Sequence, residues 1–285
     1  MSEYRRRYYH PDNLLINEAR RTISNKRSNP HKEQLFALAK KSRIAKVAGL
    51  MELLSRHHRN TFIHSFEDAF LAVSLAHGIF GEPNTANLAG YVELFEDGLL
   101  HDIGKLGVPQ ELLNVEDRSS LKEDDRKIIR MHGAYGGAIL NLVGLKSRTY
   151  ISYEHDLASG TEKSWRGIVD LDSRHELTEI VSLADLVGGL MDPRRPYHPA
   201  VDESHIAWVI DVKGQQGVFS SGLVKAFKER ISAKSLYPPF TIDDYRKNKL
   251  FMALVSKYGL GELFETAISE DRLTRQKSNT KIDGS

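Results

Sequence analysis

The 285-residue sequence contains no cysteine. Disulfide bonds and cysteine-ligated zinc sites are therefore excluded, so any metal ion must be bound by histidine and carboxylate ligands. The sequence also has no run of 18 apolar residues, and its first residues lack an apolar signal region. We therefore expect a soluble, cytoplasmic protein without a membrane span.

Internal repeats and β-type alternation of useful length are also missing. Apolar residues recur instead at helical spacing, and the 40% of residues that are hydrophobic suffice for a core. The sequence predicts an all-α fold. Ser120 and Glu123 form a capping-box pattern at the start of one helix. Helices are expected over about 14–23, 31–58, 61–80, 87–106, 120–142, 147–156, 176–190, 202–212, 221–232 and 243–267, with a disordered tail from about 271.

Positive charge is concentrated at the start of the chain. Residues 1–50 carry twelve Lys/Arg against four Asp/Glu, a net charge of +8, whereas the whole chain has +2. We interpret this segment mainly as solvated helix faces, and a nucleic-acid partner is the less favoured alternative. The helical pattern over 1–58 fits two alternatives. The segment is either a small helical cap or an arm that binds a protein partner or a second copy of the chain.

One segment, residues 101–109, combines several features of a metal site. His101 and Asp102 are adjacent and can both ligate one divalent ion, and Lys105 follows about one helical turn later. Asp97, one turn before His101, is expected at the surface, with orientation of the His101 ring as the alternative.

Other ionisable residues occur once each on otherwise apolar helices: His64, His132, His155 and Asp185, with Glu154 adjoining. Burying each without a partner would cost several kcal/mol, and a shared metal centre removes that cost for all of them. Taken one at a time, His132 is also consistent with a core histidine whose nitrogens are hydrogen-bonded. Asp185 is likewise consistent with a hydrogen-bonded structural aspartate.

These residues occur in an order that resembles the HD superfamily of metal-dependent phosphohydrolases, and more closely its HD-GYP branch of cyclic di-GMP phosphodiesterases. Residues 101–109 resemble the His-Asp-Ile-Gly-Lys-x-x-x-Pro signature of that branch. Further similar elements are His64-Ser65, Leu121 to Leu140, Ala184-Asp185, Arg195-Pro196-Tyr197 and residues 213–227. The resemblance covers roughly residues 60–230.

The chain departs from this pattern in three places. The motif His-His-Glu-x-x-Asp-Gly-x-Gly-Tyr-Pro is matched by residues 154–164, where Glu154 replaces one histidine and Glu162-Lys163-Ser164 replaces Gly-Tyr-Pro. A carboxylate suits Mn or Fe as imidazole does. Asn60 stands where some members have a glutamate ligand, so we expect two metal ions rather than three.

The resemblance implies an HD-type helical bundle over 59–235, between a basic helical extension (1–58) and a C-terminal helix with a tail (236–285). It implies two divalent ions, Fe or Mn, with Zn as the alternative and Asp102 as a bridge. The implied ligands are His64, His101, Asp102, His132, Glu154, His155 and Asp185.

The implied reaction is hydrolysis of cyclic di-GMP to linear pGpG or GMP by a metal-bound hydroxide. Asp102 and Lys105 are the expected catalytic residues. Lys105, Arg194, Arg195 and His198 are the expected substrate-binding residues, although Arg194 and Arg195 equally fit solvated charge beside a proline turn. Two alternatives remain: another nucleotide or phosphoester substrate, which the missing Gly-Tyr-Pro favours, and a non-catalytic protein that binds cyclic di-GMP or docks a partner.

Overall fold

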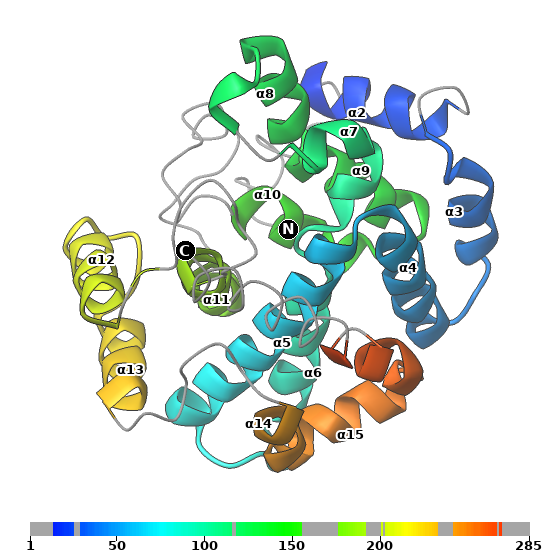
Figure 1. Ribbon diagram of the computed structural model, residues 1–285. Helices are drawn as coiled ribbons and strands as arrows, with labels where there is room; N and C mark the ends of the chain where they lie inside the picture. Colours follow the sequence, from blue (N-terminus) through cyan, green and yellow to red (C-terminus); the bar gives the residue numbers. More distant parts are fainter. Residues whose placement is uncertain are drawn as a thin grey trace, which may run out of the picture.

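The computed structural model describes residues 14–25, 29–115, 118–155, 176–191, 201, 203–232, 242–266 and 268–269, and every regular element in these ranges is a helix (Figure 1). The predicted all-α fold class is confirmed. None of the described helices is long and apolar enough to cross a lipid bilayer.

Helix α5 (Arg59–Phe80) lies at the centre of the fold. All of its residues from Thr61 to Ala76 are buried, as expected for a helix that neighbours surround on every side. Figure 1 shows α5 in the middle of the molecule, and it packs against α4 (Arg43–His57), α6 (Leu88–Leu100), α11 (Glu176–Met191) and α13 (Ser221–Ser232).

A second buried helix, α9 (His132–Leu142), packs against α2 (Leu14–Ser24), the 3-10 helix η1 (Ile103–Gly107) and α10 (Thr149–Glu154). Between α9 and α10 lies the short 3-10 helix η3 (Lys146–Arg148). Helix α10 also contacts α6 and α11, which pack against each other and against α5. This arrangement positions the candidate site.

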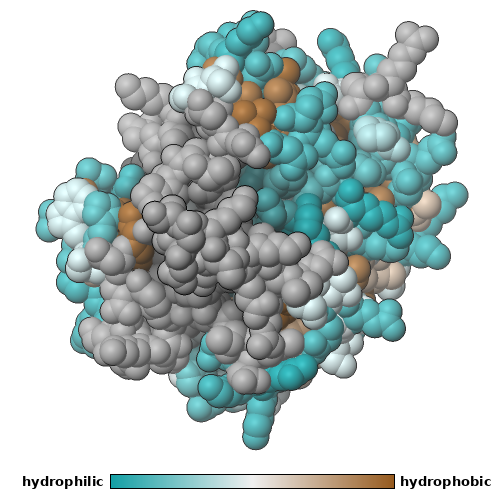
Figure 2. All heavy atoms as spheres, viewed as in Figure 1, coloured by the Kyte–Doolittle hydropathy of each residue, from teal (hydrophilic) through white to brown (hydrophobic). Residues whose placement is uncertain are grey.

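Helices near both ends of the chain contribute to the same hydrophobic core. Ile23 of α2 and Leu35 of α3 (Lys32–Leu38) are fully buried in it. Tyr245 of α14 (Ile242–Lys247) and Phe251 of α15 (Lys249–Lys257) make tilted and edge-on ring contacts with Phe70 of α5. The remaining elements are α7 (Gln110–Leu113), η2 (Arg118–Ser120), α8 (Glu123–Arg130) and α12 (Glu203–Gln215). Figure 2 shows mostly hydrophilic side chains on the described surface in this view.

Four predicted helices are interrupted in the structure. The helix expected over 31–58 is divided into α3 and α4, where the Oγ of Ser42 accepts a hydrogen bond from the Ala45 amide. The helix expected over 87–106 ends at Leu100 and continues as η1. The helix expected over 243–267 is divided by Asn248, which caps α15, and by Gly259, whose φ is 65°.

The helix expected over 120–142 is also two helices, α8 and α9, which meet at Met131. The capping-box prediction is wrong, because α8 begins after Lys122 and has no side-chain cap. None of the residues of α8 is fully buried, whereas α9 is buried from His132 to Leu140. The break lets α9 enter the core while α8 stays at the surface, and it places His132 at the start of α9.

Candidate metal centre

Seven histidine and aspartate side chains from five helices converge in two adjacent groups. The first group contains His64 and Asp68 of α5, His101 at the end of α6, and Asp185 of α11. The second contains Asp102, His132 and His155. Within each group the ligand-type nitrogen and oxygen atoms all lie within 4.8 Å of one another, so each group could hold a metal ion.

The first group is centred on two imidazole nitrogens. The Nε2 atom of His64 lies 2.9 Å from Oδ1 of Asp185 and 3.2 Å from Oδ2 of Asp68. The Nε2 atom of His101 lies 3.3 Å from the same Asp68 oxygen. His64, Asp68 and His101 are almost completely buried, whereas 18% of the Asp185 side chain is exposed.

Asp102, a member of the second group, also faces His101 of the first group. Its Oδ2 is 3.5 Å from Nε2 of His101, and its Oδ1 is 3.5 Å from Nε2 of His132 and 3.7 Å from Nε2 of His155. Lys105, one turn of η1 later, donates a hydrogen bond from Nζ to Oδ2. One carboxylate therefore presents a different oxygen to each group, which is the arrangement a bridging ligand needs.

Three histidine rings are oriented by backbone carbonyl groups. The Nδ1–H of His101 donates to the Gly98 carbonyl at 2.8 Å, that of His132 to Ile129 at 2.8 Å, and that of His155 to Ile151 at 2.9 Å. A carbonyl can only accept, so in each neutral ring the proton is on Nδ1 and the Nε2 lone pair points into the centre. Metal-ligating histidines are held in this way.

The donor atoms fit a bound cation. The Nε2 atoms of His132 and His155 are 3.2 Å apart, so two neutral rings would face each other with their lone pairs unless a proton or a metal ion lies between them. In the described part of the chain, the buried Nε2 of His101 and both oxygens of Asp68 make no hydrogen bond of acceptable geometry. Imidazole nitrogen and carboxylate oxygen together suit Mn, Fe or Zn.

The electrostatics of the site also suit a bound cation. Burial alone lowers the pKa of His101, but the carboxylates of Asp102, Asp68 and Asp185 outweigh it and raise the pKa to about 10. Burial and the nearby Asp185 hold the pKa of Asp68 well above its ordinary value. Burial opposes the ionisation of Asp102 as well, but Lys105 and His101 lower its pKa overall. A cation bound among these groups would compensate for the burial of the carboxylates.

Gly188 makes room for Asp68. A Cβ atom at position 188 of α11 would lie 2.6 Å from Oδ1 of Asp68 and 3.4 Å from Cε1 of His64. Any side chain there would push Asp68 away from His64 and His101. The close approach of α11 to α5 at this glycine therefore helps to form the first group.

Most of the residues singled out in the sequence come together here. The structure brings together His64, His101, Asp102, Lys105, His132, His155 and Asp185. The Glu154 side chain and residues Arg194, Arg195 and His198 lie outside the described residues. Sequence reasoning missed Asp68, although it lies four residues after His64, on the same face of α5.

The expectation that Asp97 lies at the surface is wrong. Asp97 is completely buried and accepts a hydrogen bond from the Tyr150 hydroxyl at 2.6 Å. It does not orient His101, whose Nδ1 donates to Gly98 instead. The partners of Asp97 are the Tyr150 hydroxyl and the Arg148 guanidinium, which lies 3.4 Å from Oδ1.

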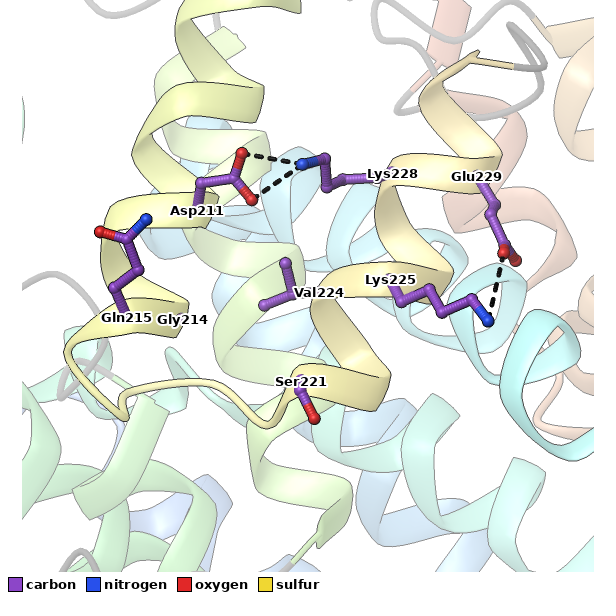
Figure 3. Close-up of a pocket in the computed structure, with 8 residues that line it drawn as sticks. All are labelled: Asp211, Gly214, Gln215, Ser221, Val224, Lys225, Lys228 and Glu229. Atoms are coloured by element: carbon purple, nitrogen blue, oxygen red, sulfur yellow. Dashed lines mark hydrogen bonds and ion pairs between the residues drawn. The ribbon is translucent and has the colours of Figure 1, made fainter.

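A separate groove lies between α12 and α13 (Figure 3). The charged side chains along it are paired, Asp211 with Lys228 at 2.8 Å and Lys225 with Glu229 at 4.0 Å. Gly214 allows the two helices to approach, because a Cβ atom there would lie 2.9 Å from Cγ2 of Val224. The groove contains none of the histidines of the metal groups.

Comparison of the chain with known protein families, curated proteins and solved structures finds no match.

Proposed function

We propose that this protein is a metal-dependent phosphodiesterase of the HD type that hydrolyses a cyclic dinucleotide, with cyclic di-GMP as the first candidate. The observation that carries the proposal is the position of Asp102, whose two oxygens face the two histidine–aspartate groups while Lys105 contacts it. Together with the signature-like segment 101–109, this geometry favours a two-metal phosphohydrolase over a core of unrelated buried polar residues.

The residues have distinct roles in the proposed centre. His64, Asp68, His101 and Asp185 would hold one ion, and His132 and His155 the other, with Asp102 shared. When bound, divalent ions would neutralise negative charge on the phosphoryl group and activate a water molecule. Lys105, whose side chain is 16% exposed, would donate to a non-bridging oxygen of the substrate and hold Asp102 ionised.

The proposal is tested by loading the full-length protein with Mn or Fe without oxygen, counting the bound ions, and measuring turnover of cyclic di-GMP. We expect two ions per chain and a linear product. Asp102→Asn keeps the shape of the side chain but removes its charge, so we expect a loss of at least about a hundredfold in turnover, in line with losing a preorganised electrostatic contact.

The other outcomes separate the alternatives. A protein that binds no Mn, Fe or Zn would overturn the metal centre. Two bound ions without turnover would point to a different phosphoester, which a panel of nucleotides and synthetic phosphodiesters would identify. A protein that binds cyclic di-GMP in calorimetry and never cleaves it would be a receptor.

A further inference from the structure

One turn of α6 carries three acidic side chains, Glu93, Glu96 and Asp97, just before the metal-group residue His101. The side chains of Glu96 and Asp97 are 1% and 0% exposed. Burial raises the pKa of Asp97 to about 7, although Arg148 opposes the shift. Such a cluster is an inefficient way to stabilise a fold, because desolvation offsets much of the attraction between buried charges.

Arg148 contacts all three acids. Its guanidinium donates to Glu96 from Nε at 3.1 Å, pairs with Glu93, and lies 3.4 Å from Oδ1 of Asp97. It also donates to the Tyr150 hydroxyl at 3.2 Å, and Tyr150 donates to Asp97. The Arg148 side chain is only 6% exposed. Arg148 ends η3 and Tyr150 belongs to α10, so these contacts fasten the start of α10 to α6.

These two elements carry residues of different metal groups. Asp97 lies one helical turn before His101, and α6 leads directly into Asp102. Arg148 precedes α10, a helix of less than two turns that ends beside His155. A short hydrogen-bonded helix transmits the position of its first turn to its last, so the contacts of Arg148 act on the distance between His155 and Asp102.

We propose that Arg148 is a positioning residue that holds His155 where His155, His132 and Asp102 bind one metal ion together. This inference rests on the proposed metal centre. Arg148 itself does not contact the second group. Its effect passes through Tyr150 and α10 on one side and through Glu93, Glu96 and Asp97 of α6 on the other.

A second arginine that contacts one of the same acids provides a matched control. Arg43 of α4 donates to the same Glu96, from Nε to Oε1 at 2.8 Å. Helix α4 carries no residue of either metal group. Replacing Arg43 removes one cation from the network without touching α10, so the two arginines separate stabilisation of the network from positioning of His155.

The experiment compares full-length wild type with Arg148→Met, Arg43→Met and Tyr150→Phe in Mn(II) titrations. Binding is followed by calorimetry and by electron paramagnetic resonance, which distinguishes coupled from isolated Mn(II). We expect Arg148→Met to weaken the second ion by about 10–100-fold, as is usual for residues that support metal ligands, while the first ion binds within twofold of wild type. The coupled signal should give way to that of isolated Mn(II). Tyr150→Phe should also weaken binding of the second ion, by a smaller factor than Arg148→Met does. Arg43→Met should bind both ions with wild-type affinity.

Each contrary result has a distinct meaning. Wild type that fails to bind two ions would overturn the proposed function and this inference together. If wild type binds two ions and Arg148→Met does so with equal affinity, Arg148 only stabilises the fold. Equal weakening in Arg43→Met would likewise overturn a specific role. If Arg148→Met does not fold, Tyr150→Phe decides, because it leaves every charge in place and normal binding by it would contradict the proposal.

Discussion

At the scale of single residues, three Nδ1-to-carbonyl hydrogen bonds fix histidine rings before any ion is present. Asp68 differs from these histidines, because it has no hydrogen bond among the described residues to compensate for its burial. A metal-free centre should therefore be the least stable part of the core.

The substitution Asp68→Asn tests this residue. We expect it to weaken binding of the first metal ion by at least about tenfold, because it removes a charged ligand. The metal-free protein should keep or gain stability, because the pKa of the buried Asp68 is raised and a neutral amide is less costly to bury than a carboxylate. Metal titrations and urea unfolding of chelated protein measure the two effects.

The neighbouring Glu67→Gln is the matched control, since Glu67 is also buried on α5 but belongs to neither metal group. It makes the same change of charge one residue away. Wild-type metal affinity in Asp68→Asn, or an equal loss in Glu67→Gln, would remove Asp68 from the candidate centre.

At the scale of elements, the fit of η1 against α9 decides where Asp102 meets His132. Gly104 allows this fit, because a Cβ atom there would lie 1.7 Å from the His132 carbonyl oxygen and 2.4 Å from the Gly136 nitrogen. Both contacts are with backbone, which cannot rotate away as a side chain can. Glycine is required here for space between two elements.

We expect Gly104→Ala to destabilise the metal-free protein by about 3 kcal/mol or more, because overpacked cores respond by moving backbone. Binding of the second ion should also weaken, since the movement separates Asp102 from His132. Urea unfolding and Mn(II) titration measure the two effects.

Gly90→Ala on α6 is the control, since a Cβ atom there meets nothing within 4 Å, and its expected effect on stability is neutral or slightly stabilising. Equal stability of the two variants would show that η1 can move away from α9 at little cost.

At the scale of the whole molecule, a chain of hydrogen bonds joins the N-terminal helices to the segment after η1. Nε2 of His57 lies 2.9 Å from the Val108 carbonyl, which can only accept, so the proton of His57 is on Nε2. The Nδ1 of His57 therefore accepts from Nε2 of His31, 3.1 Å away. Burial, and then His57, lower the pKa of His31 to about 4, and burial lowers the pKa of His57 although its hydrogen bond to Val108 opposes the shift.

Because of this histidine pair, the free energy of unfolding should decrease at acidic pH. A histidine whose pKa is lower in the folded than in the unfolded protein contributes stability that is complete above the ordinary value of 6.5 and is lost as the pH falls through that value toward 4. Urea unfolding of chelated protein at pH 7.5 and 5.0 measures the loss. His31→Gln keeps a donor toward His57 but does not titrate, so we expect a smaller loss than in wild type. Equal losses in the two proteins would show that His31 does not contribute.

The sequence by itself determined the all-α class, because apolar residues at helical spacing select helices locally. It also identified seven residues that the structure brings together. Three of them share the segment 101–109, and the other four are ionisable side chains on apolar helices, which have to find a partner inside the fold. Only the tertiary structure decided where the long helices break, as at Met131, because those breaks follow from which segments enter the core. It alone added Asp68 and the contacts of Arg148, because both depend on helices that are distant in sequence and meet only after packing.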